Sequence, residues 1–273
     1  MTSGSGKAGR AAGRKHIIQE SELHVAAMRG DLAEVVSRLD AGADVNERDW
    51  LGTTPLHAAV EGSGAPAFLP SRLALLSAQR DIPESDSRPD GSEAAAPDHL
   101  AVARLLLATG ADVDARDRRE TTPLSLAAAR GGIAMAQLLL DHGADIEASD
   151  EDRANPLMHA AAANQYAMFR FLLEHGADVY ARTAQGRTLL MLAADNGGME
   201  VARDLLGRGA DVNARSADGS TALMLAATKG HAEVKSLLLD AGAEVGFLEA
   251  VAFGDLNQAC ISPLPGPDAR TAL

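Results

Sequence analysis

The chain has very little cysteine and very little aromatic surface. Cys260 is the only cysteine, so no disulfide can form within the chain, and a reducing compartment is its natural environment. Only 3% of the residues are aromatic although 46% are hydrophobic, so small residues and leucine must build the core. No run of about 18 apolar residues is present for a membrane span, and the N-terminus lacks the apolar core of a signal peptide.

Positive charge is also scarce beyond the first residues. The formal net charge is −13. Residues 1–15 contain Lys7, Arg10, Arg14 and Lys15 and no acid, so subtracting these four charges leaves −17 for the remainder. An acidic body of this kind argues against general nucleic-acid binding. We expect a cytoplasmic protein, with the nucleus as the alternative, that does not engage a membrane.

A Gly-Ala-Asp marker recurs along the chain. Its copies begin at Gly42, Gly110, Gly143, Gly176, Gly209 and, as Gly-Ala-Glu, at Gly242. The first step is 68 residues long and every later step is 33. Self-similarity at a period of this length predicts stacked repeats rather than one globular core.

Residues 121–153 show what one period contains. TPLSLAAAR and AMAQLLLDH predict two short helices with apolar faces. Thr122 can accept from the free backbone donors of the first turn, Pro123 suits the first helical position, and Gly143 can adopt the left-handed conformation that ends the second helix. Because helices of about two to three turns do not hold alone in water, they must be stabilised by stacking on their neighbours.

The residues in these slots resemble those of ankyrin repeats. The resemblance rests on TTPLH at 53–57, TTPLS at 121–125, LLLDHGADI at 138–146 and LLGRGADVNA at 205–214. It implies an all-α ankyrin-repeat solenoid, in which each repeat is a helix-turn-helix unit with a β-hairpin loop. It also implies non-catalytic recognition of a protein partner on the concave face, with a regulatory or inhibitory subunit of an enzyme as the alternative.

We expect one repeat domain, residues 19–261, between two tails. Residues 1–18 have the composition of a disordered basic tail, with a transit peptide as the alternative, and residues 262–273 form a disordered Pro-rich tail. The predicted repeats are 19–52, 53–120, 121–153, 154–186, 187–219 and 220–246, followed by a truncated cap at 247–261. Residues 63–97 within the second repeat are either an insertion, which we favour, or a decayed extra repeat.

Neither the histidines nor the carboxylates indicate a catalytic or metal site. Every histidine except His16 and His159 falls in a recurring repeat slot, and none has zinc-ligand spacing with the cysteine. The carboxylates of residues 145–152 fall in a predicted hairpin, where we expect them to be solvated and to repel one another. General acid–base catalysis needs a carboxylate with a shifted pKa inside a cleft. We therefore predict no enzyme activity, no metal and no cofactor.

The resemblance also implies where a partner binds, because hairpin tips and the exposed face of the first helix vary without cost to the scaffold. The matching positions are Trp50, Leu51, Glu61, Arg118, Arg119, Arg130, Glu151, Asp152, Tyr180, Gln185, Asp195, Asn196, Asp218 and Lys229. Trp50 is the only tryptophan, and Trp and Arg are enriched among residues that carry binding energy. The alternative is that Trp50 packs on a neighbouring tip or on residues 63–97. We expect a monomer that binds a protein.

Asn46 and Asn213 each follow Asp-Val after a leucine-rich helix. This setting resembles the site that an oxygen-sensing asparaginyl hydroxylase modifies in ankyrin repeats. The alternative is that both asparagines simply satisfy hairpin hydrogen bonds.

Overall fold

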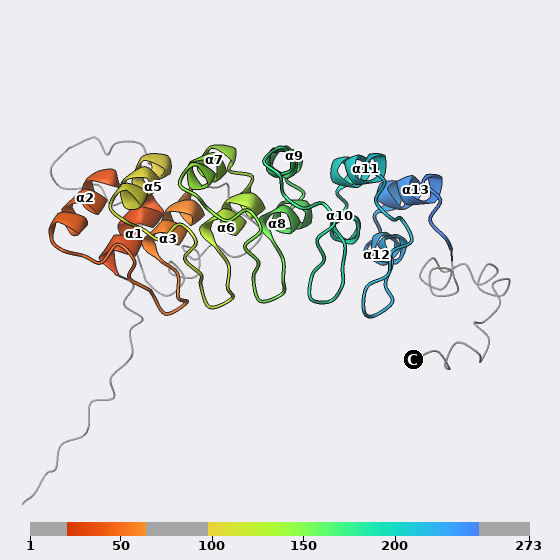
Figure 1. Ribbon diagram of the computed structural model, residues 1–273, viewed down its shortest axis with the longest axis horizontal. Coiled ribbons are helices and arrows are strands. Elements are labelled where there is room, and N and C mark those ends of the chain that lie inside the picture. The colour runs from red at the N-terminus through yellow and green to blue at the C-terminus, as the bar shows by residue number, and fades with distance from the viewer. Residues whose placement is uncertain (1–20, 64–97, 246–273) are drawn as a thin grey trace, which may run out of the picture.

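The computed structural model describes residues 21–63 and 98–245. Over these ranges the chain forms an elongated row of helix pairs, and the loops that join successive pairs all extend to the same side (Figure 1). The predicted all-α solenoid is confirmed: beyond its helices, this part of the chain has one isolated β-bridge, between Arg182 and Thr188.

The helices form two layers (Figure 1). The first helices of the pairs lie nearer the hairpin loops and are α1 (Glu22–Arg29), α3 (Pro55–Gly62), α6 (Pro123–Arg130), α8 (Pro156–Ala162), α10 (Leu189–Asp195) and α12 (Ala222–Lys229). The second helices are α2 (Leu32–Asp40), α5 (His99–Ala108), α7 (Ile133–Asp141), α9 (Tyr166–Glu174), α11 (Met199–Gly207) and α13 (Ala232–Asp240). None of the helices in the described ranges is long and apolar enough to cross a membrane.

The helix ends follow the expected capping chemistry. The Thr122 hydroxyl accepts a hydrogen bond from the backbone N–H of Ser125 at 3.3 Å, and Gly143 has a φ of +85° after α7. The second pair differs, because the Thr54 hydroxyl lies 2.9 Å from Nδ1 of His57. The same ring also contacts the next repeat, because Nε2 of His57 lies 3.1 Å from the carbonyl oxygen of Thr121.

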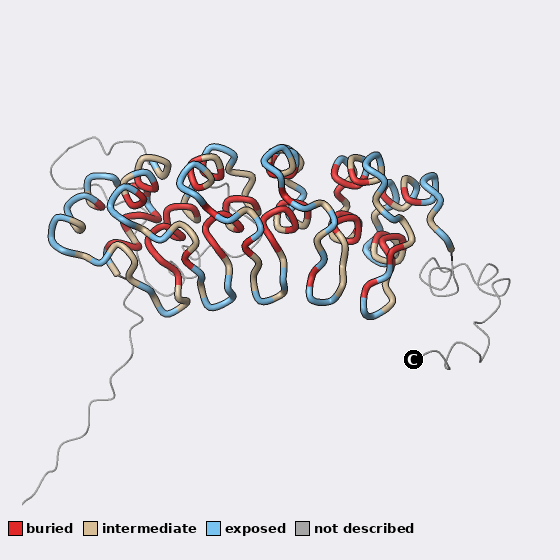
Figure 2. The backbone as a smooth tube through the Cα atoms, viewed as in Figure 1, coloured by how far each residue is buried: buried red, intermediate tan, exposed pale blue. Residues whose placement is uncertain are grey.

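The core runs as a band between the two helix layers (Figure 2). Alanine pairs such as Ala127 and Ala128 are at most 1% exposed, which lets neighbouring first helices approach closely. Helix α3 packs on α1, α5 and α6, so the helices on either side of residues 64–97 contact each other. The assignment of both to one repeat stays a prediction. Residues 64–97 themselves, the two predicted tails and the predicted cap from residue 246 onward lie outside the described residues.

Backbone hydrogen bonds fix the spacing of the hairpin tips, which are residues 50–51, 118–119, 151–152, 184–185 and 217–218. At each junction an N–H of the later tip donates to a carbonyl of the earlier one. The bonds are Arg118 to Leu51 (2.9 Å), Glu151 to Arg119 (3.1 Å), Ala184 to Asp152 (2.7 Å) and Ala217 to Gln185 (2.8 Å). The tips therefore form a continuous row that holds their side chains at fixed separations.

A second row of bridges uses one side-chain slot per repeat. Asp114 accepts from the N–H of Asp145 at 3.0 Å, and Glu147 accepts from the N–H of Asp178 at 2.7 Å. Asn46 and Asn213 occupy the same slot. Tyr180 occupies this slot in the fourth repeat and is 75% exposed; no bridge of this kind is described for its side chain.

Candidate functional site: the concave groove

We use the name concave groove for the surface between the hairpin tips and the exposed side of the first helices, which contains the pocket described below. Its floor follows one slot of the first helices, and this slot holds Leu126, His159, Leu192 and Leu225 at steps of 33 residues. All four side chains are half-buried. The floor is thus an apolar strip that a single histidine interrupts.

The groove deepens into a pocket of about 660 Å³ between α8 and α10. Met158, His159, Ala162 and Leu192 line its floor, and residues of the tips at 151–152, 184–185 and 217–218 line its side. A volume of this size falls within the range of about 300–1,000 Å³ typical of ligand pockets.

Small residues hollow out this pocket. Ala154 occupies the hairpin slot that Arg187 fills one repeat later, and Ala162 occupies the helix slot that Asp195 fills one repeat later. Both alanines line the pocket. The equivalent residues one repeat earlier, Thr121 and Ala129, are also small, so the third and fourth repeats share small side chains at these slots and the fifth replaces them with charged ones.

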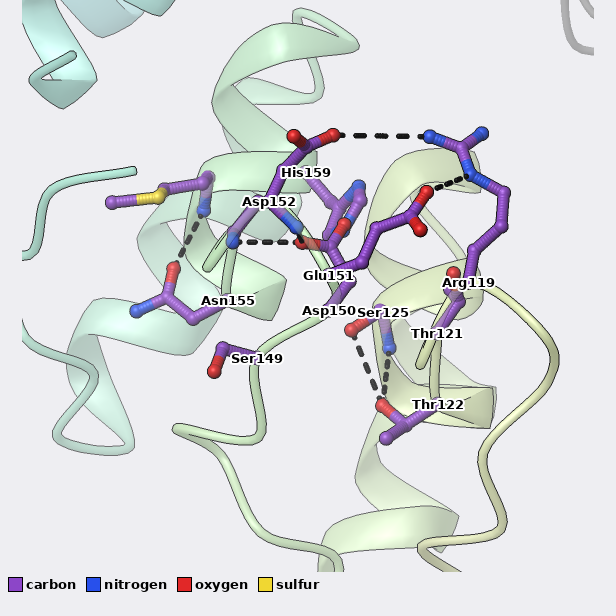
Figure 3. Close-up of polar contacts among 12 residues, drawn as sticks. Arg119, Thr121, Thr122, Ser125, Ser149, Asp150, Glu151, Asp152, Asn155 and His159 are labelled. Carbon is purple, nitrogen blue, oxygen red and sulfur yellow. Dashed lines mark hydrogen bonds and ion pairs between the residues drawn. The ribbon is translucent and has the colours of Figure 1, made fainter. Parts of the chain in front are cut away.

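His159 and Asp150 form a polar pair in the pocket (Figure 3). Nε2 of His159 lies 3.0 Å from Oδ2 of Asp150, whose side chain is 6% exposed. Oδ1 of Asp150 accepts from the N–H groups of Asp152 and Ala154, both at 2.9 Å. Burial would raise the pKa of Asp150, but the hydrogen bonds from His159 and the two amides outweigh burial and leave the pKa below its usual value.

The charged tips are paired with one another across repeats. Nε of Arg119 lies 3.0 Å from Oε1 of Glu151, and a second guanidinium nitrogen lies 3.9 Å from Oδ2 of Asp152 (Figure 3). The side-chain amide of Gln185 donates to Oδ1 of Asp152 at 3.1 Å. The expectation that the carboxylates of residues 145–152 are solvated is wrong for Asp150, whose side chain is 6% exposed. Glu151 and Asp152 are solvated as expected, with side chains 51% and 50% exposed, but each also pairs with Arg119.

Because these pairs are largely exposed, they contribute little to stability. The side chains of Arg119 and Glu151 are 67% and 51% exposed, and exposed ion pairs are typically worth about 0–1 kcal/mol. A partner that offers its own charges can replace them at low cost.

A further charged group lies at the edge of the pocket, whose lining includes Arg187 and Asp218. Arg187 lies 3.4 Å from one oxygen of Asp195, and Lys229 lies 3.9 Å from the other. Asp218, at an exposed tip, accepts from the hydroxyl of Ser216 at 2.5 Å and from the N–H of Ser220 at 3.0 Å. These hydrogen bonds lower the pKa of Asp218 to about 2, with that of the Ser216 hydroxyl the largest contribution.

The structure separates the residues selected from the sequence into groups. Four of them line the pocket: Arg119, Asp152, Gln185 and Asp218. Glu151 and Asp195 contact the pocket's lining through ion pairs with Arg119 and Arg187, and Lys229 pairs with Asp195.

The remaining selected residues lie away from the pocket. Glu61 and Arg130 are half-buried at the ends of α3 and α6, and the exposed Asn196 donates to the carbonyl of Leu192 at 3.0 Å. At the tips Leu51 is half-buried, Arg118 is exposed, and Trp50 is 46% exposed. None of these residues, nor Tyr180, lines the pocket.

Sequence reasoning missed His159, Ala154 and Ala162. The signal was available, because an alignment at a period of 33 places His159 in a row of leucines and the two alanines in slots that hold charged residues one repeat later. The candidate residues were selected by residue type and not by comparison with the equivalent positions of the other repeats, so all three were missed.

Asn46 and Asn213 bridge neighbouring repeats with both ends of their amides. Asn46 donates to the carbonyl of Gly110 at 3.0 Å and accepts from the N–H of Asp112 at 2.8 Å. Asn213 donates to the carbonyl of Gly242 at 3.3 Å and accepts from the N–H of Glu244 at 2.8 Å. Both therefore have a structural role, and their hydroxylation stays a prediction.

Within the described ranges, no group of three or more His, Cys, Asp or Glu residues is arranged to hold a metal ion.

Comparison with known proteins gives matches that agree with this architecture. A family model described as ankyrin repeats (3 copies) matches residues 92–183 and 180–248, and a second, described as ankyrin repeats (many copies), matches residues 23–65. The solved ankyrin repeat domain of human ASB11 superposes with a TM-score of 0.63 at 26% identity, covering 83% of this chain and 86% of that one.

A human protein, neurogenic locus notch homolog protein 1, is 32% identical over 40% of this chain, and the matched region spans 6% of that protein's length. Ankyrin repeats are in general protein–protein interaction modules and are typically non-catalytic. Because the family models match more than half of its residues, the chain belongs to the ankyrin repeat family.

Proposed function

We propose that this protein is a non-catalytic binding module that holds a protein partner in the concave groove. The observation that carries the proposal is the pocket between α8 and α10, which places an apolar floor beside a row of charged tips. Protein interfaces combine an apolar centre with a polar rim in this way.

The architecture supports the proposal in a second respect. The hairpin tips are joined by backbone hydrogen bonds, so the groove is already in place before a partner arrives. A preformed surface lowers the entropy lost on binding. The side chains of Arg119, Glu151 and Asp152, by contrast, form largely exposed ion pairs that a partner can exchange for its own.

The test is capture of partners by the full chain, compared with two charge variants. Arg119→Glu with Asp218→Lys reverses two charges of the groove. Arg170→Glu is the matched control, because Arg170 is exposed on α9 outside the pocket and its ion pair, at 3.1 Å, is with Glu174 of the same helix. We expect a partner, identified by mass spectrometry, that the control captures and the groove variant loses.

A partner that both variants retain would place binding outside the concave groove and refute the proposal. If the captured partner is an enzyme, its turnover with and without the wild-type chain decides whether the chain acts as an inhibitor.

A further inference from the structure

The pocket's lining predicts the chemistry of what enters it. We infer that it receives an extended segment of the partner that places an apolar side chain over Met158, Ala162 and Leu192, with a lysine or arginine beside it directed to Asp152 and Asp218. This inference rests on the proposed function and adds to it the class of partner.

The apolar half of the inference follows from the floor. Met158 is 1% exposed, and Ala162 and Leu192 are half-buried. The neighbouring hairpin contributes Ala154, and the tips contribute Ala184 and Ala217. These residues offer neither donor nor acceptor in their side chains, so an apolar side chain covers them without leaving a polar group unpaired.

The cationic half follows from the balance of charge. The pocket's own lining includes the carboxylates of Asp150, Asp152 and Asp218. Its two guanidinium groups are already engaged: Arg119 pairs with Glu151 at 3.0 Å and lies 3.9 Å from Asp152, and Arg187 pairs with Asp195 at 3.4 Å.

The ion pairs at the rim leave the net charge of the pocket and its rim negative. With the two pairing acids and Lys229 included, five carboxylates face three cations. Among the described ion pairs none involves Asp218, and its pKa of about 2 keeps it charged. A cation therefore finds carboxylates available, whereas an anion meets a net negative rim.

The extended form follows from the shape. Four consecutive tips contribute to the pocket's lining, from Arg119 to Asp218. Asp152 and Asp218 lie two repeats apart, which at usual helix separations of about 8–10 Å places them roughly 16–20 Å from each other. An extended chain rises about 3.3 Å per residue, so about five or six residues span this distance. A linear peptide is thus long enough to reach from Asp152 to Asp218.

The experiment is a selection of random dodecapeptides displayed on phage against the full chain, followed by affinity measurements with the synthesised winners. We expect winners that contain Leu, Met or Phe next to Lys or Arg. Two variants then locate their site. Ala154→Arg fills the pocket with the residue that the next repeat carries in that slot, and Thr121→Arg makes the same change in the preceding repeat, outside the pocket.

We expect Ala154→Arg to weaken the affinity of the winning peptides at least tenfold, because it removes the binding energy that the pocket contributes. Thr121→Arg should leave their affinity within about twofold of the wild type, because it does not block the pocket. The double variant Asp152→Asn with Asp218→Asn keeps the acceptor oxygens but removes both charges. It should weaken binding about tenfold and flatten the dependence on salt, as expected for lost charge attraction.

The outcomes separate this inference from the function it rests on. Winners without a cation, or winners that Ala154→Arg does not weaken, overturn the inference while the groove can still hold a folded partner. A selection that yields no winner also overturns the inference, because a free peptide should be able to bind where an extended segment of the partner binds. The proposed function itself fails only if the charge-reversed groove variant retains the captured partner.

Discussion

At the scale of single residues, the hairpin tips combine exposed side chains with ion pairs that cross from one repeat to the next, such as that of Arg119 with Glu151. Trp50 and Arg118 are exposed at the tips as the repeat pattern implied. The pair between Arg119 and Glu151 was not predicted, because the two residues stand 32 positions apart. Their contact depends on the sideways offset of neighbouring hairpins, which periodicity does not give.

Tyr180 stands where the scaffold elsewhere uses a bridging side chain. Tyr180→Asn should restore the bridge between the fourth and fifth repeats and raise the free energy of unfolding by about 1 kcal/mol, the usual net value of a hydrogen bond. Asn213→Ala should lower it by a similar amount, because it removes two bonds at the next junction. Urea denaturation followed by circular dichroism measures both. A loss of stability in Tyr180→Asn would show that the tyrosine itself packs on its neighbours.

Asp150 makes stability depend on pH. Its pKa is lower in the folded protein than in the unfolded chain, so its contribution is fully present above the unfolded value of about 3.9 and is lost as the pH falls through the folded value. Asp150→Asn should therefore unfold more easily than wild type at pH 7, and the gap should close as the pH falls below about 4. Thermal melts from pH 7 to pH 3 check this, and a gap that does not change with pH would contradict it.

Trp50 tests whether an exposed tip residue is part of the interface. Its side chain is 46% exposed, so it buries little of the core. If Trp50 belongs to the partner site, Trp50→Ala should weaken a captured partner by about 2 kcal/mol or more while the melting temperature hardly changes. Calorimetry of binding and of unfolding provides both readings. Unaltered binding with a lower melting temperature would mean that Trp50 packs on its neighbours.

At the scale of elements, the helix ends were the most predictable features. Threonine before the first helix and glycine after the second recur with the period, and both perform the expected capping in the third repeat. The role of His57 was less predictable. Its slot was recognised, but its bond to the carbonyl of Thr121 requires the neighbouring repeat to be in place, and a single repeat does not contain that information.

Two glycines should respond oppositely to the same substitution. Gly143 has a φ of +85°, so Gly143→Ala should lower the free energy of unfolding by about 1 kcal/mol, the cost of a left-handed conformation in a residue with a Cβ. Gly207 is the last residue of α11 and has open space around an added methyl group. Gly207→Ala should be neutral or raise stability by up to about 1 kcal/mol, because alanine favours the helix. Equal effects on the urea midpoint would refute this assignment of the helix ends.

At the scale of the whole molecule, each repeat covers the apolar side of the one before it. Met191 and Ala194 of α10 are at most 1% exposed, and α12 packs on that helix. The equivalent residues of α12, Met224 and Ala227, are half-buried. The period predicted this dependence between neighbours, but it could not predict how much of the last described repeat stays uncovered.

Shortening the chain tests that dependence. A chain that ends at Gly219 loses α12 and α13 and uncovers Met191 and Ala194, so it should melt at a lower temperature and self-associate. A chain that ends at Val245 keeps both helices and removes only the predicted cap and tail; it should lose less stability than the shorter chain. Circular dichroism melts and light scattering at matched concentrations measure the two effects. If the chain ending at Gly219 stays monomeric and melts with the full chain, the repeats do not depend on their neighbours. If the chain ending at Val245 is as unstable as the shorter one, the segment after Val245 stabilises the solenoid as much as a complete repeat does.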